Sequence, residues 1–136
     1  MKKILLLVLF YFVSAGYAQN KIENNSPLLG KIKVEKLQDA NFNFIQNASI
    51  SWNFSQIELN NAALSIEVVT ILDCFNGEQA SEFKDQFTIL SKESFSLVGT
   101  TQLNHLELMA KCFKWRLVAK TSETAVSDWF YFSFVK

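Results

Sequence analysis

The chain has 136 residues, with 13 Lys or Arg side chains balanced by 13 Asp or Glu side chains. Residues 1–18 contain two of the lysines, and without this segment 11 basic and 13 acidic side chains leave a net charge of −2. This balance excludes the strong positive field typical of proteins that bind nucleic acid or anionic membranes. The 13 Phe and three Trp residues are enough to fill one sizeable core.

The first 18 residues have the pattern of a Sec signal peptide. Two lysines precede an apolar run over residues 4–13, and Gly16 and Ala18 are the small residues that a signal peptidase reads before a cut at Gln19. A membrane anchor is the alternative interpretation. The apolar run is shorter than the roughly 20 residues that a spanning helix needs, so cleavage is favoured.

Removal of this segment predicts a protein that is secreted, periplasmic or on the cell surface, and that spans no membrane after cleavage. The single Arg, set against 12 Lys and 11 Asn, is a composition that suits a bacterium with an AT-rich genome. Residues 19–30 begin with a polar, Asn-rich stretch, and we expect them to be a flexible lead-in. The remaining residues, 31–136, have the length of one sandwich domain.

Alternation of apolar and polar residues predicts strands from residue 31 onward. Residues 31–37 and residues 41–45 both alternate, and they form either one bent strand or two. Residues 48–54 place Ile50, Trp52 and Phe54 on one face.

The middle of the chain predicts a further strand over residues 64–72, in which alternation breaks at Val68 and Val69. This break indicates either a bulge or a strand buried on both faces. Asn76-Gly77 is a strong turn signal, and residues 78–85 form a loop or one helical turn. Residues 87–90 and 94–98 are short strand candidates.

The end of the chain contains two alternating runs joined by a polar turn, which predicts a β-hairpin. The first run places four apolar side chains on one face and three basic side chains on the other. They are Phe113, Trp115, Leu117 and Ala119, and Lys114, Arg116 and Lys120. The second run places Phe130, Phe132 and Phe134 on one face.

This hairpin resembles the last two strands of a fibronectin type III domain, which end in a Ser-x-Trp pattern like that of Ser127 and Trp129. Trp52 resembles the core tryptophan of the family's second strand, and Leu106 or Leu108 resembles the leucine that plugs the sandwich. The resemblance implies an all-β, antiparallel two-sheet sandwich of about seven strands over residues 31–136.

The same resemblance implies a disulfide between Cys74 and Cys112, because the third and penultimate strands of such a sandwich are antiparallel neighbours. An oxidising compartment permits this bond, and closing a loop of 38 residues would stabilise the fold by up to about 4 kcal/mol. Strand parity argues against the bond, since Cys112 shares a face with Lys114 and Arg116, whereas Cys74 shares a face with Val68 unless a bulge at Val68-Val69 flips the register. Two free thiols are the alternative.

Catalytic and cofactor sites are not predicted. His105 is the only histidine, and its neighbours match no metal-ligand spacing, so we expect it to be a surface side chain. The four glycines do not cluster into a phosphate-binding loop. We therefore expect no catalytic residue, metal or cofactor, and no enzymatic activity.

The feature of the sequence that best suggests function is the outer face of the last hairpin. If Phe130 points inward, Trp129 and Tyr131 point outward beside Lys114 and Arg116. This arrangement is similar to the cation-π ladder of cytokine-receptor type III domains. Either Arg116 stacks on Trp129 as a structural element, or the aromatic side chains form an exposed binding platform.

We therefore expect a secreted, non-catalytic protein-interaction module that is a small subunit or accessory factor of a bacterial cell-envelope or surface assembly. A free-standing adhesion or glycan-binding module that uses the same four side chains is the alternative. Strand addition to the edge of the first strand is another way in which a partner would bind.

Overall fold

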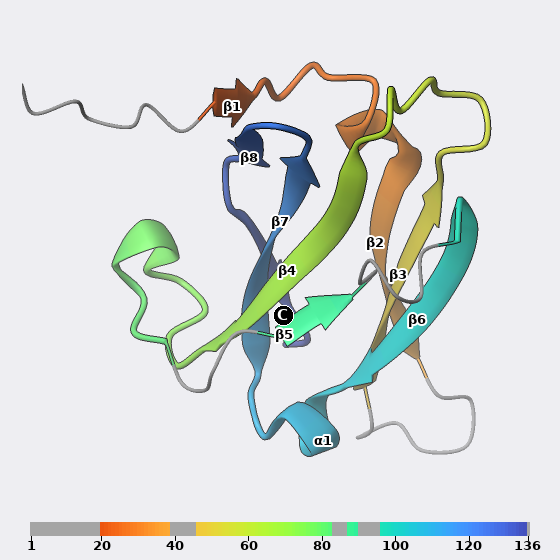
Figure 1. Cartoon of the computed structure of the whole chain (residues 1–136). Helices are drawn as coiled ribbons and strands as arrows, with labels where there is room; N and C mark the ends of the chain where they lie inside the picture. Colours follow the sequence, from red (N-terminus) through yellow and green to blue (C-terminus); the bar gives the residue numbers. More distant parts are fainter. Residues whose placement is uncertain (1–19, 39–45, 83–86, 90–95, 136) are drawn as a thin grey trace, which may run out of the picture.

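The computed structural model of the chain describes residues 20–38, 46–82, 87–89 and 96–135. The predicted signal peptide at residues 1–18 and the predicted strand at residues 41–45 lie outside the described residues. Two β-sheets pack face to face and account for most of the described chain (Figure 1). The prediction of an all-β, two-sheet architecture is confirmed.

The larger sheet has the strand order β1-β8-β7-β4-β5, with β9 also paired to β7. Its strands are β1 (Asn20–Ile22), β4 (Ala63–Ile71), β5 (Phe87–Ile89), β7 (Cys112–Lys120), β8 (Thr124–Ser127) and β9 (Phe130–Ser133). The smaller sheet has the order β2-β3-β6, with β2 (Ile32–Gln38), β3 (Gln46–Asn53) and β6 (Val98–Asn104). Three short helical turns, η1 (Leu29–Lys31), η2 (Gly77–Gln79) and α1 (His105–Leu108), lie between strands.

The core lies between the two sheets and is built from the alternating apolar residues of their inner faces. Ile50 and Phe54 are fully buried, as are Ile66, Phe113 and Leu117 on the opposite sheet. Leu108 also packs against this cluster, whereas Leu106 is 55% exposed, so Leu108 is the leucine at the end of the sandwich.

Trp52 fills the end of the core next to β6. Its side chain is buried, and its indole Nε1 donates a hydrogen bond to the carbonyl oxygen of Ser96 over 2.9 Å. Gly99 lies directly opposite Trp52 in the β3–β6 register. A Cβ atom built on Gly99 would lie 2.4 Å from the indole, so the close approach of this ring requires glycine.

The position of β6 differs from the strand predicted at residues 94–98, of which residues 94 and 95 lie outside the described residues. In the structure the strand begins at Val98 and continues to Asn104. Its inner face carries Gly99, Thr101 and Leu103, because each pairs with an inward residue of β3. The large indole of Trp52 replaces the apolar side chains that would make the alternation visible, so the sequence pattern here is weak.

The end of β4 is buried on both faces. The pairing of β4 with β7 runs without interruption from Ala63 opposite Lys120 to Ile71 opposite Cys112, so no bulge interrupts it at Val68 and Val69. Both of these valines are buried. Of the two predicted explanations for the break in alternation, burial on both faces is therefore the one that the structure supports.

The segment that was expected to be a flexible lead-in is folded onto the sandwich from residue 20 onward. β1 pairs in parallel with β8, which makes it the one exception to antiparallel pairing among the described strands. Ile22 and Leu29 are buried in the main core. The expectation of flexibility was wrong here because two apolar residues separated by a polar stretch show no periodicity, and long-range pairing with β8 orders the segment.

We expect Gly99→Ala to lower the free energy of unfolding by about 1–3 kcal/mol, because the added methyl group forces the Trp52 indole or the backbone to move. Urea denaturation measures this change. Gly30→Ala is the matched control, since a Cβ atom at Gly30 meets nothing within 4 Å. Equal stability of the two variants would contradict the packing role assigned to Gly99.

Candidate binding face

The last strand of the sandwich is interrupted by a β-bulge. Val126 of β8 pairs with Val118, and Phe130 of β9 pairs with Trp115. Residues 127–129 therefore lie opposite only two residues of β7, which leaves one extra residue in the last strand. The bulge shifts the alternation by one position, so that Val126 and Trp129 both face outward.

The Ser127 side chain provides hydrogen-bond partners for backbone groups that the bulge removes from regular strand pairing. Its hydroxyl group accepts a hydrogen bond from the Leu117 backbone N–H over 2.9 Å and donates one to the Asp128 carbonyl oxygen over 2.8 Å. Ser127 is only 4% exposed, so water cannot replace these bonds. Asp128 forms a salt bridge with Lys21 of β1 at 3.1 Å and raises the pKa of this lysine above its usual value.

The bulge places Trp129 against the two cations of β7. The Lys114 Nζ atom lies 4.6 Å from the Trp129 ring centroid, and the Arg116 guanidinium carbon lies 4.5 Å from it. Contacts of this kind stabilise a fold by about 0.5–1 kcal/mol at exposed sites and more when desolvated. The predicted stacking of Arg116 on Trp129 is confirmed, and Lys114 takes part in it as well.

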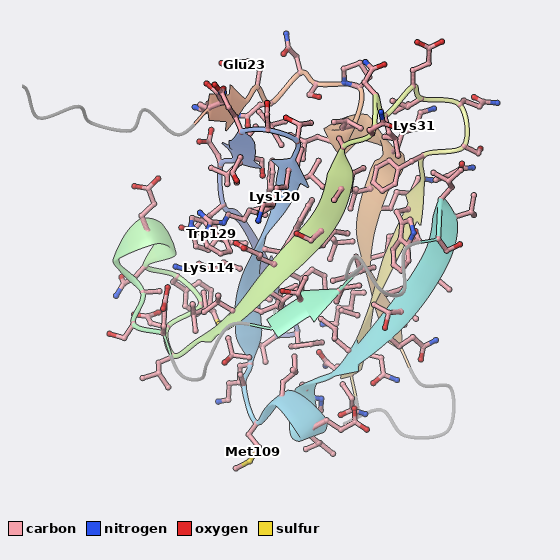
Figure 2. The ribbon with its side chains drawn as sticks, viewed as in Figure 1. Glu23, Lys31, Met109, Lys114, Lys120 and Trp129 are labelled. Atoms are coloured by element: carbon pink, nitrogen blue, oxygen red, sulfur yellow. A yellow bond between two sulfur atoms is a disulfide. The ribbon has the colours of Figure 1, made fainter. Side chains whose placement is uncertain are left out.

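Each cation also has a carboxylate partner. Glu82 Oε1 lies 2.7 Å from Lys114 Nζ, and Glu67 Oε2 lies 2.6 Å from Arg116 Nε. We call the five side chains Glu82, Lys114, Trp129, Arg116 and Glu67 the ladder. Figure 2 shows Lys114 and Trp129 next to one another, beside the loop that contains η2. Lys114 is only 9% exposed, and burying a charge costs free energy unless the charge is paired, as Glu82 pairs this one.

Tyr131 lies at the edge of the ladder. It pairs with Lys114 in the β7–β9 register, faces outward and is 37% exposed. The structure thus brings the four side chains predicted for this face, Lys114, Arg116, Trp129 and Tyr131, onto one surface. Two of them, the cations, are held by carboxylates, whereas Tyr131 remains accessible.

Cys74 and Cys112 form a disulfide that joins a loop to the start of β7. Their Cα atoms are 5.5 Å apart. The parity argument against the bond fails because β4 ends at Ile71 and Cys74 lies in the following turn, where strand alternation no longer sets the direction of a side chain. The disulfide, Ile71 and Ala80 form a second small apolar cluster on the outer face of the larger sheet.

The disulfide-held loop, residues 72–82, carries Glu82 to the ladder. The backbone N–H of Leu72 donates to the Ser81 carbonyl oxygen, and Glu82 forms an isolated bridge with Ile71. Phe75, the residue after Cys74, is 82% exposed. No periodic pattern marks Phe75 as a functional residue; its one distinguishing feature in the sequence is that it is an aromatic residue in the polar turn between Asp73 and Asn76.

His105 is a structural side chain and not the surface residue that was expected. It is half-buried, and its Nδ1 atom lies 3.1 Å from the backbone nitrogen of Gln46 and 3.0 Å from the Gln46 carbonyl oxygen. Its ring also packs at a tilt on Phe134. The described part of the chain contains no group of three or more His, Cys, Asp and Glu side chains arranged to hold a metal ion.

Comparisons of the chain with protein-family models, with curated proteins and with solved structures find no match. Within the described residues, no helix is both long enough and apolar enough to cross a membrane.

We expect Ser127→Ala to lower the free energy of unfolding by about 1–3 kcal/mol, because it leaves the buried Leu117 N–H without an acceptor. Chemical denaturation monitored by tryptophan fluorescence measures this loss. Ser133→Ala is the control, since the Ser133 hydroxyl group donates only to the Val135 carbonyl oxygen at an exposed site. A loss of equal size in both variants would argue against a specific role for Ser127.

Replacing both cysteines, Cys74→Ala with Cys112→Ala, should lower the free energy of unfolding by up to about 4 kcal/mol, because the unfolded chain gains the freedom of a 38-residue loop. Thermal and urea denaturation of the variant test this. Wild-type protein treated with dithiothreitol should approach the same stability. An unchanged wild type under reducing conditions would show that the bond contributes little.

Proposed function

We propose that this chain is an exported, non-catalytic protein-interaction module with a fibronectin type III-like fold, a small subunit or accessory factor of a bacterial cell-envelope or surface assembly. The signal-peptide pattern of residues 1–18 supports export. The Cys74–Cys112 disulfide suits an oxidising compartment outside the cytoplasm.

Three features support the fibronectin type III-like classification. β4 and β7 are antiparallel neighbours, as the third and penultimate strands of that family are. Trp52 is a core tryptophan on the second strand of the sandwich, counted from β2. Trp129 follows Ser127 in the last strand and packs against cations of the preceding strand, like the ladder of cytokine-receptor domains.

The observation that carries the binding proposal is the accessible Tyr131 on a pre-ordered face. The ladder holds the surrounding side chains in place through two salt bridges and two cation-π contacts. A partner that packs on this face therefore orders few further side chains, which lowers the entropy cost of binding. Tyrosine is also among the residues that contribute most energy to protein interfaces.

The arrangement favours a protein partner over a glycan. A sugar-binding platform needs an open aromatic face, and Lys114 and Arg116 both lie over the Trp129 ring. Glu67 and Glu82 further cover the cations. Tyr131 is then the accessible aromatic side chain of the face, and one ring at an interface suits a protein contact.

We test this proposal with a benzophenone amino acid at position 131 in the protein expressed and exported by its source cells. Irradiation should produce a cross-link to a discrete partner protein, which mass spectrometry identifies. Tyr131→Ala should weaken binding of the purified partner at least about tenfold. Met109→Ala, which removes an apolar side chain that is 70% exposed on another part of the surface, should leave binding unchanged.

A probe at position 131 that forms no cross-link to another protein, or binding that Tyr131→Ala leaves intact, would rule out this face as the docking site. Trp129→Ala adds a second comparison. Because Trp129 orders the cations, its loss should weaken partner binding together with stability, whereas Tyr131→Ala should affect binding alone.

A further inference from the structure

Phe75 is a solvent-exposed apolar side chain on a loop that a disulfide and a local hydrogen bond hold in place. It is 82% exposed, the largest exposed fraction among the large apolar side chains of the described residues. The preceding residue, Cys74, is bonded to β7, and the Phe75 backbone N–H donates to Asp73 Oδ1 over 3.0 Å. A loop fixed in this way loses little conformational entropy when its apolar tip is buried by a partner.

The charge of the disulfide-held loop restricts the kind of surface that suits it. Residues 72–82 contain Asp73, Glu78 and Glu82 and no Lys or Arg. Glu82 is engaged by Lys114 but its side chain remains 58% exposed. The complementary surface is therefore an apolar depression with positive charge at its rim.

The smaller sheet of this same chain carries a depression with two lysines in its lining and Val98 as its exposed apolar side chain, which we call the hollow. It has a volume of about 450 Å³ and lies next to η1, where β2 and β6 begin and β3 ends. Its lining includes Lys31, Lys33, Ser51, Trp52, Asn53 and Val98. Neither lysine forms a salt bridge with a described residue, and the nearby Glu35 is not part of the lining.

We propose that the disulfide-held loop of one molecule docks into the hollow of a second copy, with Phe75 packed against Val98 and the loop carboxylates facing Lys31 and Lys33. Lys31 lies on the side of the molecule away from the loop that contains η2 (Figures 1 and 2). A molecule therefore cannot fill its own hollow. The contact joins two different surfaces, so it is heterologous and extends copies head to tail.

The size of the two surfaces sets the strength of this association. One loop and one hollow bury less area than the roughly 1,200–2,000 Å² of a stable interface, so the contact should be weak and dependent on concentration. Weak self-association of this kind suits a subunit that is concentrated at a cell surface. The contact does not use Tyr131, and it stands independently of the proposed docking face.

Sedimentation velocity of the processed protein tests the proposal. We expect reversible association as the concentration rises to about 1 mM at low salt, and weaker association at about 0.5 M salt. Phe75→Ala should weaken it by about ten- to a hundredfold, because the buried aromatic surface is lost. Lys31→Glu with Lys33→Glu should abolish it, whereas Met109→Ala and Tyr131→Ala should leave it unchanged.

A mixing experiment distinguishes this contact between two different surfaces from a symmetric dimer contact, in which both copies use the same surface. The Phe75→Ala protein keeps its hollow, and the Lys31→Glu, Lys33→Glu protein keeps its loop. Each should be monomeric alone, and the two together should form one-to-one dimers that do not extend.

A wild-type protein that stays monomeric under these conditions would overturn the proposal. Association that survives Phe75→Ala, or a mixture of the two variants that stays monomeric, would overturn it as well. All of the substituted side chains are on the surface, and unchanged melting temperatures confirm that the variants are folded. Failure of this test leaves the cross-linking result at Tyr131 as it stands, so the two proposals are judged separately.

Discussion

The pairing of β4 with β7 sets the positions of the core and of the candidate binding face at once. Successive residues of a strand point to opposite sides, so one register places two rows of side chains. The inner row brings Ile66 opposite Leu117 in the core. The outer row brings Glu67 opposite Arg116 and ends with Ile71 opposite Cys112, where the disulfide begins.

The ladder depends on two departures from regular β structure. The bulge between β8 and β9 turns Trp129 outward, and Ser127 compensates for the backbone hydrogen bonds that the bulge disrupts. The turn after β4 allows Cys74 to meet Cys112, and the closed loop returns with Glu82 beside Lys114. Without the returning loop, Lys114 would be a nearly buried charge that lacks the Glu82 carboxylate, and an uncompensated buried charge is costly.

Two surfaces of the molecule differ in the interactions that they favour. The ladder face is internally neutralised and pre-ordered, and its accessible aromatic side chain is Tyr131. The loop and the hollow are instead complementary in charge, with unlike surfaces on opposite sides of the sandwich. We accordingly propose that copies of the chain associate through the loop and the hollow, and that another protein binds at the ladder face.

Sequence patterns predicted the parts of this protein that depend on local alternation. The two-sheet class, the strands around Trp52 and Leu64, and the grouping of Trp129 and Tyr131 with Lys114 and Arg116 follow from period-two patterns and agree with the structure. The position of β6 did not follow, because the Trp52 indole replaces the large side chains that an inner strand face usually shows.

Other features were decided only by contacts between residues far apart in the chain. The polar segment before η1 is ordered because β1 adds to β8, and no local pattern encodes that pairing. The disulfide, the position of Glu82 and the exposure of Phe75 depend on where the chain turns after Ile71. Alternation predicts which way a side chain faces only within a strand, and beyond the strand end the tertiary structure determines it.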